Sequence, residues 1–514
     1  MPENSRASRK DAKPTSQPKV RRGISHTAAR QVFLFFAGAT VVASPWMLGS
    51  ASVVAQKFLL VGALATLVSG ILVRMTTRLT PGTKAAWRVQ RQALAAGIVF
   101  LGLLFWQATN PSHQVLISGK SWQLMEVGHA SGVPSSLAAP FDTMPGDFLP
   151  YKNAWRFLLI FGVAWIYAGG LVLGLVERED ARRWALIVGV NAAALAAVCI
   201  IHRALGAELT LWKYRDTVAF TGSPVFFYKN HNGAYLAASL AIVLGLASAA
   251  KEATRRRIWE GVGLALWVAT LAVNSRVATG CATLWLVVYG VWLWRNAPAK
   301  RHGETKKNFW SAPFVAAAIV VVLVALTGGG KMLGRFSQAL HSPGDFIQGG
   351  HYRVLLREIG LEMWLDRPIF GWGGGAYLYL FNGHQARVPE VVQQMYAEQP
   401  TLNRLYMISA DCDWVEFLAE YGAVGVALLL LATGTLAFAT WRWDGWKQGL
   451  PFFLAVSGVG LALHAWYDHI LRNQALLILF LSVFVVGSRL AAPREPSKRR
   501  LNANVKPTTA STSS

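Results

Sequence analysis

The chain has 514 residues, of which 53% are hydrophobic and only 15% are charged, and its formal net charge is +24. Soluble domains usually carry about 25% charged residues, so a chain of this composition cannot expose its whole surface to water. The positive charge does not indicate nucleic acid, because lysines and arginines stand mainly in short clusters between apolar runs, as in membrane proteins. Three scattered cysteines without a CxxC pair exclude a disulfide framework.

Apolar runs recur along the chain at lengths that suit a lipid bilayer, whose core of ~30 Å needs about 20 apolar residues per helix. We therefore predict an all-α polytopic membrane protein of about twelve transmembrane helices, with ten to twelve as the range because the first two runs could form a hairpin that does not span fully. The predicted spans are 31–49, 54–74, 92–108, 154–176, 182–202, 232–250, 258–274, 277–294, 312–328, 414–440, 450–466 and 471–488.

The orientation follows from the distribution of Lys and Arg, which concentrate in cytoplasmic segments. If the N-terminus is cytoplasmic, the inside segments hold 33 of the 50 Lys and Arg residues, whereas the reverse orientation places Arg255, Arg256 and Arg257 outside. We expect both termini in the cytoplasm, no cleavable signal peptide, and disordered basic tails at 1–30 and 489–514.

Two outside segments are long. Residues 109–153 follow the third predicted helix, and residues 329–413 form a large periplasmic loop between the ninth and tenth, which is too long for an idle connection. Within the large loop, apolar and charged residues alternate over 353–366, a pattern typical of an amphipathic helix at the membrane surface.

Several lysines and arginines lie in these outside segments, although such residues concentrate in cytoplasmic segments. This departure suggests that they have a function. Arginine binds phosphate oxygens through a planar fork, so several arginines near one membrane face suit a lipid-linked phosphate or diphosphate. The alternative is that they are solvated loop charges or partners of lipid headgroups. They are Arg203, Lys213, Arg215, Lys229, Arg276, Lys331, Arg335, Arg353 and Arg357.

Polar residues inside the last apolar runs form two pairs at helical spacing, and such residues are costly in a membrane. Glu416 and Glu420 lie on one face of the predicted tenth helix, and Asp413 with Glu416 also fits a capping box at its start. His464 and Asp468, followed by His469 and Arg472, could be functional or could form an ordinary hydrogen bond between helices.

Four motifs in order resemble the O-antigen ligase and polymerase family, membrane glycosyltransferases that act on undecaprenyl-diphosphate-linked glycans. The resemblance covers roughly residues 215–485. The motifs are Phe226 to Ala234 (F-F-Y-K-N-H-N-G-A), the turn Asn274-Ser275-Arg276, the stretch from Arg353 to Gly375 with D-R-P-I-F-G-W-G inside it, and Asp413 to Gly422 (D-W-V-E-F-L-A-E-Y-G).

The resemblance implies catalytic roles for particular positions. The two arginines that hold the donor diphosphate in the family fall on Arg276 and Arg353. An aspartate at the outer end of one of the family's last helices falls on Asp468. The family's catalytic histidine precedes the D-W pair, but that slot here holds Asp411. We therefore hypothesise that Asp411 is the general base, because a carboxylate can also accept the acceptor's proton; the rival view is that the base is lost.

The remaining expectations complete the predicted site. Substrate-binding roles are assigned to Arg215, Lys229, Asn230, Asn232, Arg357, Asp413, Glu420 and Asp468. We expect no cofactor and no metal site, because arginine can fill the phosphate role. The glycines of 371–375 could approach phosphate oxygens or form a hinge, and the hinge is favoured.

The predicted function is therefore transfer of a glycan from undecaprenyl diphosphate to a hydroxyl acceptor, a glycan or lipid A core, with inversion, at the periplasmic face of the bacterial inner membrane. Polymerisation of O-antigen or exopolysaccharide is the nearest alternative. A non-catalytic component stays open because the histidine is absent, and a transporter is disfavoured because no pair of broken midplane helices is evident.

Overall fold

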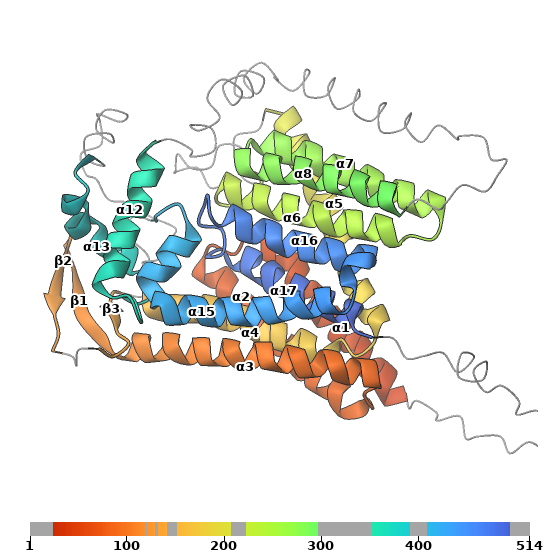
Figure 1. The fold of residues 1–514 in the computed structure, drawn as a ribbon, viewed down its shortest axis with the longest axis horizontal. Coiled ribbons are helices and arrows are strands. Elements are labelled where there is room, and N and C mark those ends of the chain that lie inside the picture. The colour runs from red at the N-terminus through yellow and green to blue at the C-terminus, as the bar shows by residue number, and fades with distance from the viewer. Residues whose placement is uncertain are drawn as a thin grey trace, which may run out of the picture.

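The computed structural model describes residues 24–118, 121–128, 132–140, 152–206, 223–296, 351–390 and 409–493. Figure 1 shows long helices lying side by side along the longest axis of the molecule, with a small sheet and two short helices at one end. The described part is thus mostly helical, as predicted, but it also contains a sheet that an all-α prediction lacks.

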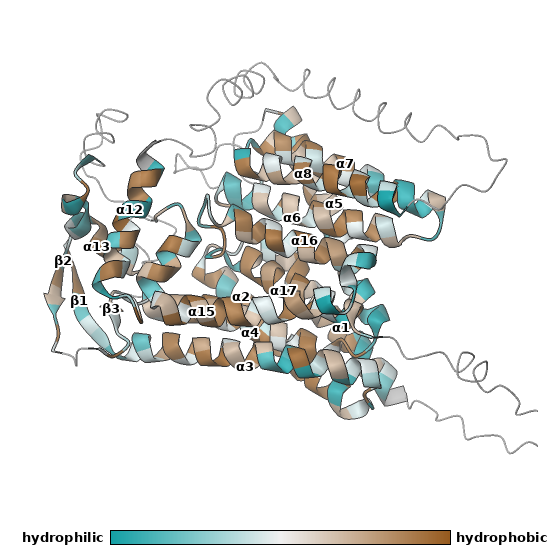
Figure 2. Cartoon of the chain, in the orientation of Figure 1, coloured by the Kyte–Doolittle hydropathy of each residue, from teal (hydrophilic) through white to brown (hydrophobic). Residues whose placement is uncertain are grey.

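Among the described residues, nine helices are long and apolar enough to cross a membrane. They are α1 (Ile24–Trp46), α2 (Val53–Thr76), α3 (Pro81–Thr109), α4 (Ala154–Gly174), α5 (Arg178–Ala204), α6 (Lys229–Ala249), α8 (Arg276–Arg295), α15 (Asp413–Arg442) and α17 (Gln474–Ala491). Figure 2 shows that hydrophobic residues dominate the middle of these helices and that hydrophilic residues gather at the ends of the bundle. This distribution is that of a multi-pass membrane protein.

Every predicted span within the described part of the chain forms a helix, and the predicted span 312–328 lies outside the described residues. Two further helices of the bundle pack beside α6. They are α7 (Ala253–Val273) and the shorter apolar helix α16 (Gly449–His464). The run Arg255-Arg256-Arg257 lies in the first turns of α7, so its apolar stretch is shorter than the helix itself.

Helix starts follow the capping chemistry of their sequences. Ser52, Thr80 and Asn153 stand immediately before α2, α3 and α4, and each side chain accepts a hydrogen bond from a backbone N–H of the first turn. Asn473 does the same at the start of α17, where its Oδ1 accepts from two backbone N–H groups. These caps satisfy donors that a helix leaves unpaired and so define where each helix begins.

The helix α17 forms the centre of the bundle, and all of its residues are buried. It contacts α4, α15 and α16 along its length. At its last turn, Arg489 is buried and its guanidinium donates to the carbonyl oxygens of Leu175 and Val176 at the end of α4 and to Thr83 Oγ1 on α3. Such bonds satisfy carbonyl groups that the end of α4 leaves unpaired.

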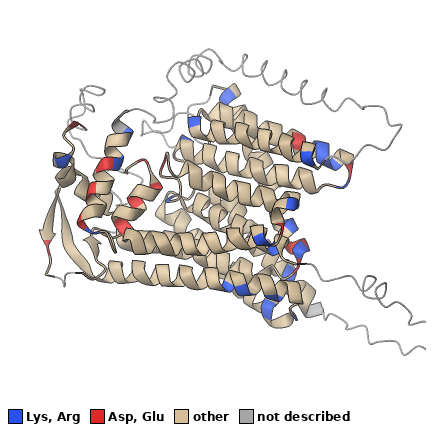
Figure 3. Ribbon diagram, in the orientation of Figure 1, with Lys and Arg blue, Asp and Glu red and all other residues tan. Residues whose placement is uncertain are grey.

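We call the end of the bundle with Ile24 and Pro493 the terminal end. Arg30 at the start of α1 pairs there with Asp180 at the start of α5, with 2.7 Å between Nη2 and Oδ1. In Figure 3, Lys and Arg cluster strongly at this end, whereas both signs of charge occur at the other end. Because cationic clusters mark one side of a membrane, this asymmetry agrees with the predicted grouping of the inside segments.

We call the opposite end the loop end, and it carries a second hydrophobic core. Three short strands, β1 (Pro111–Ser118), β2 (Ser121–Glu126) and β3 (Ser136–Ala138), form a sheet in the order β2-β1-β3, antiparallel between β1 and β2 and parallel between β1 and β3. The helices α12 (His351–Asp366) and α13 (Ala376–His384) pack beside it.

The predicted amphipathic helix exists as α12, and most of its apolar side faces protein, although Leu361 and Leu365 are exposed. Leu355, Ile359 and Met363 are buried in the second core together with Tyr377 of α13 and Val415 of α15. These residues therefore stabilise the loop end and are not free to enter lipid, because the adjoining helices and sheet already cover them.

Candidate active site

The helix α12 presents two arginines to residues 465–473, the loop that joins α16 to α17. Arg353 and Arg357 lie one turn apart on one face of the helix. Arg353 Nη1 donates to the backbone carbonyl oxygen of Tyr467 at 3.1 Å, and the guanidinium of Arg357 lies 5.8 Å from the centre of the Tyr467 ring. The buried Nε and Nη2 of Arg357 have no hydrogen-bond partner among the described residues, which leaves donors for a ligand.

The carboxylate of Asp411 joins Arg353 to a histidine of that loop. Its Oδ2 lies 3.2 Å from Arg353 Nε, and its Oδ1 lies 3.3 Å from His469 Nδ1. His469 Nδ1 also lies 3.1 Å from Asp468 Oδ1 and 3.0 Å from the hydroxyl oxygen of Ser409. We call these five residues the His469 cluster.

Asp411 adopts a left-handed backbone conformation, with φ of 48°. This conformation is uncommon for residues with a side chain, although Asp tolerates it better than most, and it persists only where surrounding contacts compensate for the strain. The turn separates Asp411 from Asp413, whose Oδ2 accepts from the backbone N–H of Leu471 at 2.6 Å. The two aspartates of this D-x-D sequence therefore point to different partners.

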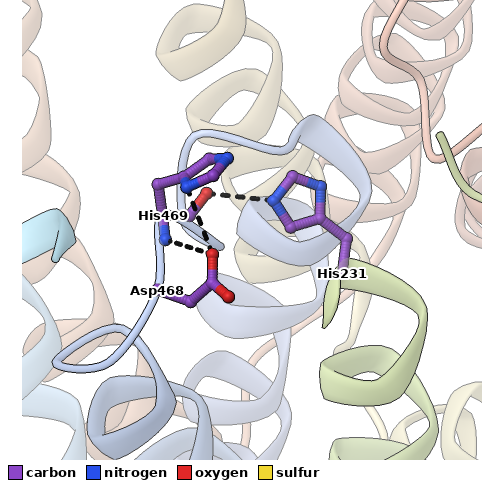
Figure 4. Close-up of side chains that lie close together, drawn as sticks. All are labelled: His231, Asp468 and His469. Carbon is purple, nitrogen blue, oxygen red and sulfur yellow. Dashed lines mark hydrogen bonds and ion pairs between the residues drawn. The ribbon is translucent and has the colours of Figure 1, made fainter. Parts of the chain in front are cut away.

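The start of α6 closes the other side of the cluster, as Figure 4 shows for His231. Asn230 Nδ2 donates to Asp468 Oδ2 at 2.5 Å and to the hydroxyl oxygen of Tyr228 at 2.8 Å. His231 Nε2 lies 3.1 Å from the carbonyl oxygen of His469, and the Tyr228 ring stacks on the His469 ring at 5.4 Å. The structure thus brings together the predicted site residues Asn230 and Asp468.

Two carboxylates determine the charge of His469. Burial alone would lower the pKa of His469, but hydrogen bonds to Asp411 and Asp468 outweigh it and raise the pKa from its ordinary 6.5 to about 10. Burial would likewise raise the pKa of Asp468, but its bond to His469 and the nearby histidines hold that pKa well below its usual range. At neutral pH the cluster therefore contains an imidazolium and an ionised carboxylate.

Within the described part of the chain, His231, Asp468 and His469 could supply metal ligands, since their candidate ligand atoms lie within 4.8 Å of one another (Figure 4). The histidine nitrogens, however, already lie near protein oxygens. His231 Nε2 lies near the carbonyl oxygen of His469, and His469 Nδ1 lies near two carboxylates. A metal ion would have to displace these contacts, so the geometry is that of a hydrogen-bonded charge network.

The predicted tight turn before Arg276 is present at the loop end. Asn274 adopts the left-handed conformation that ends α7, and Ser275 stands immediately before α8, which begins at Arg276. A Cβ added at Gly233 would lie 2.7 Å from Cβ of Ser275, so this turn packs against the first turns of α6. Arg276 itself is exposed, and it shares with Asn230 the same end of the bundle.

The predicted site residues Asp413 and Glu420 belong to a separate, buried ion cluster. Arg472 Nη2 lies 2.8 Å from Glu420 Oε2, its Nη1 lies 3.0 Å from Glu416 Oε1, and its Nε lies 3.6 Å from Asp413 Oδ1. Lys152 Nζ lies 3.6 Å from Glu416 Oε1. These five residues, here called the Arg472 cluster, attach the start of α15 to the loop before α17 and to the segment before α4.

The capping-box interpretation of Asp413 is wrong. Cys412 precedes the helix as its N-cap residue, and Asp413 is already the first helical residue. Glu416 accepts a hydrogen bond from the backbone N–H of Ala410 through Oε2, not from the N-cap residue. The acidic residues at this helix start serve the Arg472 cluster instead.

His464 and Asp468, which stand at helical spacing in the sequence, are not hydrogen-bonded to each other. The helix α16 ends at His464, so Asp468 is no longer one helical turn away. Asp468 instead bonds with Asn230 and His469, and the buried Nε2 of His464 has no partner among the described residues. Of the two alternatives left open for Asp468, an ordinary hydrogen bond between helices is present, but its partner is Asn230 on α6.

The glycine-rich segment 371–375 is an architectural joint with α15. Gly422 breaks the helical conformation of α15 with φ of 63°, and the backbone N–H groups of Trp372 and Gly373 donate to the carbonyl oxygens of Ala419 and Glu420 at 2.9 and 2.8 Å. The N–H group of Ala423 donates in return to the carbonyl oxygen of Pro368 at 2.9 Å. Because the amides of residues 371–373 are paired with protein, these three N–H groups are not available to phosphate oxygens.

Two more predicted substrate-binding residues, Asn232 and Lys229, lie in the first turn of α6, and other predicted cations lie outside the described residues. Asn232 is fully buried and donates to Cys199 Sγ on α5 at 3.4 Å, so it points into the bundle. Lys229 is half-buried at the start of α6. The positions Lys213, Arg215, Lys331 and Arg335 lie outside the described residues.

The sequence motifs assign no site role to Ser409, His469 or Arg472. The available signal was the run of ionisable residues Asp468, His469 and Arg472 in a stretch that is otherwise apolar. Such residues are rare near membranes and mark functional or paired sites. Ser409 and His469 are 60 positions apart, and Arg472 is more than 50 positions from each of its carboxylate partners, so spacing along the chain could not identify these pairs.

No curated protein matches the chain. A family model described as O-antigen ligase matches residues 261–430, which include α8, α12, the Gly422 joint and Asp411. The resemblance inferred from the motifs is therefore confirmed: residues 261–430 are similar to the O-antigen ligase family.

Proposed function

We propose that this protein is a glycosyltransferase of the O-antigen ligase type that uses an undecaprenyl-diphosphate-linked glycan as donor. The acceptor is a hydroxyl group on lipid A core or on another glycan, and the loop end faces the periplasm from the bacterial inner membrane. One observation carries the proposal: in a chain similar to O-antigen ligases, Arg353 pairs with the Asp411 carboxylate of the His469 cluster, and Arg357, one turn away, lies over Tyr467 of the same loop.

The charge of this site suits a diphosphate. Within the His469 cluster, the cations Arg353 and His469 balance the carboxylates Asp411 and Asp468. Arg357 adds a further cation with unpaired donors, and Arg276 lies at the same end of the bundle. Guanidinium groups form strong, charge-assisted bonds with phosphate oxygens, so the excess positive charge favours an anionic donor.

In the proposed reaction, the acceptor hydroxyl oxygen attacks the anomeric carbon while the bond from that carbon to the diphosphate oxygen breaks. Asp411 accepts the hydroxyl proton, and Arg276 and Arg353 stabilise the charge on the departing diphosphate. An ionised carboxylate has about four acceptor positions. Arg353, Ser409 and His469 occupy three of them, which leaves one for the acceptor. A single displacement with one base inverts the anomeric configuration, and no step requires a metal ion.

The Arg472 cluster supports this site without touching the substrate. Asp413 and Glu420 are fully buried and face Arg472, so we assign them positioning roles in place of substrate contact. Through Arg472 they orient the loop that carries Asp468 and His469. Lipid contacts are made by the exposed apolar side chains along the helices.

Deletion of the gene in its native host, followed by analysis of surface glycans, tests the function. Loss of glycan attachment with accumulation of lipid-linked glycan supports a ligase. Shortened chains would identify a polymerase, and precursor retained on the inside of the membrane would identify a transporter. Unchanged surface glycans and lipid-linked pools would contradict the proposal.

Complementation of the deletion strain tests the arginines. We expect Arg353→Ala and Arg276→Ala to lower transfer by about 10²-fold or more, since each removes a group that stabilises charge in the transition state. Arg387→Ala is the matched control, because Arg387 is a half-exposed loop-end arginine that pairs with Asp366 and Glu362. Wild-type activity of Arg353→Ala would remove this residue from the mechanism.

A further inference from the structure

The imidazole of His469 has one nitrogen committed to protein and one available to a ligand. Nδ1 lies within 3.3 Å of Ser409, Asp411 and Asp468, as given above. No described residue forms a hydrogen bond with Nε2, and 26% of the side chain is exposed, so this nitrogen is not enclosed by protein. Figure 4 shows the second ring nitrogen directed away from Asp468.

Neighbouring groups hold the ring in one orientation. Tyr228 stacks on its face with 14° between the ring planes, and His231 meets it edge-on at 5.2 Å. A ring that is stacked on one side and bonded through Nδ1 cannot rotate freely, so the direction of Nε2 is determined before a ligand arrives. Preorganised donors bind a ligand without the cost of ordering them on binding.

Two carboxylates on one side of the ring favour the doubly protonated form. An imidazolium donates through both nitrogens, so Nε2–H becomes a fixed cationic donor on a ring that shares Asp411 with the guanidinium of Arg353. The same arrangement disfavours a role for His469 as a base, because a base must first lose the proton that Asp411 and Asp468 stabilise.

We propose that His469 is a diphosphate-binding residue, which donates from Nε2–H to a phosphate oxygen of the lipid-linked donor. The inference rests on the proposed function, because it names a further contact to the same donor. It explains why the cluster contains two carboxylates: Asp468 and Asp411 keep the imidazole charged, and Asp411 also holds Arg353. The family's catalytic histidine is absent from this chain, and His469 does not take over its role as a base. The His469 ring acts as a cation instead.

Binding of diphosphate probes to the full-length protein in detergent tests this inference. Inorganic pyrophosphate and geranyl diphosphate are titrated into wild type, His469→Gln, His469→Arg and the control His113→Gln, whose histidine lies on β1. We expect His469→Gln to weaken binding by about tenfold or more, because a charge-assisted bond is lost. His469→Arg retains the charge and should bind within a few-fold of wild type, and His113→Gln should bind as wild type does.

The pH dependence of geranyl diphosphate binding provides a second readout. The charged and titratable groups near the ring are Asp411 before α15, Asp413 on α15, Arg353 on α12, His231 on α6, His464 at the end of α16 and Asp468 in the loop after it. Because the pKa of His469 is raised to about 10, its charge persists up to that pH. Wild-type affinity should therefore stay constant from about pH 7 to 9, whereas an ordinary histidine loses its charge near 6.5.

Three results would overturn the inference. Wild-type affinity in His469→Gln excludes a contact to the diphosphate, and the surface-glycan assay would still test the proposed function independently. Equal loss of binding in folded His469→Gln and His469→Arg shows that positive charge is not what matters. A bound metal ion in purified wild type that is absent from His231→Ala would assign the ring nitrogen to metal coordination.

Discussion

Asp411 is held by several polar contacts and by its backbone conformation. Its carboxylate contacts a guanidinium, an imidazole and the hydroxyl of Ser409, and its backbone is in the left-handed region. A residue held in this way has little freedom to move, so a shape-preserving substitution separates its chemistry from its role in the structure.

We expect Asp411→Asn to abolish glycan transfer while leaving the protein folded, because asparagine tolerates the same backbone conformation but cannot accept a proton. Transfer is measured by surface-glycan analysis in the complemented deletion strain, and folding by size-exclusion chromatography in detergent. Ser409→Ala is the companion variant, since it removes a hydrogen bond without changing charge. Full activity of Asp411→Asn would show that Asp411 is not the base.

Arg472 is the residue on which the buried ion cluster depends. Its guanidinium faces three carboxylates and packs over Phe157 and Phe417, with distances of 4.9 and 5.4 Å to the ring centres. Removal of one member of a buried ion cluster leaves uncompensated charge in a medium of low dielectric constant, which is strongly destabilising.

We therefore expect Arg472→Met to lower the free energy of unfolding by ~3–5 kcal/mol, the cost typical of breaking a buried ion pair. The measurement is thermal unfolding in detergent. Arg442→Met is the control, because Arg442 is exposed in the last turn of α15. An Arg472→Met protein that unfolds at the wild-type temperature would mean that the acidic residues are neutral and need no partner.

At the scale of elements, α15 is interrupted where another segment crosses it. Gln107 at the end of α3 donates to the carbonyl oxygens of Phe370 and Glu420 at 2.6 and 3.0 Å, so α3, the glycine-rich segment and α15 meet at one point. The exchanged backbone bonds require close approach, which only a residue without Cβ permits at Gly422. This joint places α12 and its arginines over residues 465–473.

We expect Gly422→Ala to destabilise the protein by more than ~1 kcal/mol. Alanine would be strained at φ of 63°, and its Cβ would collide with the carbonyl group of Ile369. Gly434→Ala in the same helix is the control, since nothing lies within 4 Å of a Cβ there. Yield and unfolding temperature of both variants are compared. Equal behaviour of the two variants would contradict a backbone joint at Gly422.

At the scale of the whole molecule, the two ends of the bundle differ in chemistry. The terminal end carries most of the cationic clusters, and the loop end carries the sheet, α12 and the His469 cluster (Figures 1 and 3). Cationic segments remain in the cytoplasm during insertion, so this asymmetry predicts that the candidate active site faces the periplasm.

Cysteine labelling in intact cells tests this orientation. Cys199, Cys281 and Cys412 are first replaced, and single cysteines are then introduced at Gly128, at the loop end, or Lys251, at the terminal end; both positions are exposed. We expect a maleimide reagent that reaches only the periplasm to label Gly128→Cys and not Lys251→Cys. Both should react after the membrane is permeabilised. Labelling of Lys251→Cys alone would reverse the topology.

The sequence by itself determined the helices and their grouping, because hydrophobic run length and charge distribution are properties of consecutive residues. It also pointed to Arg353, Asp411 and Asp468 through motifs in a fixed order. It could not predict the sheet at 111–138, because short strands in a loop produce no run long enough to distinguish them.

Only the tertiary structure decided which polar residues meet. Glu420 and Asp413 were expected at the substrate but face Arg472, and Asp468 pairs with His469 and Asn230 in place of His464. The reason is physical: a buried charge takes the partner that packing brings within about 3 Å, and such partners here come from α6, α12, α15 and the loop before α17. The His469 cluster exists because those four segments end at the same place.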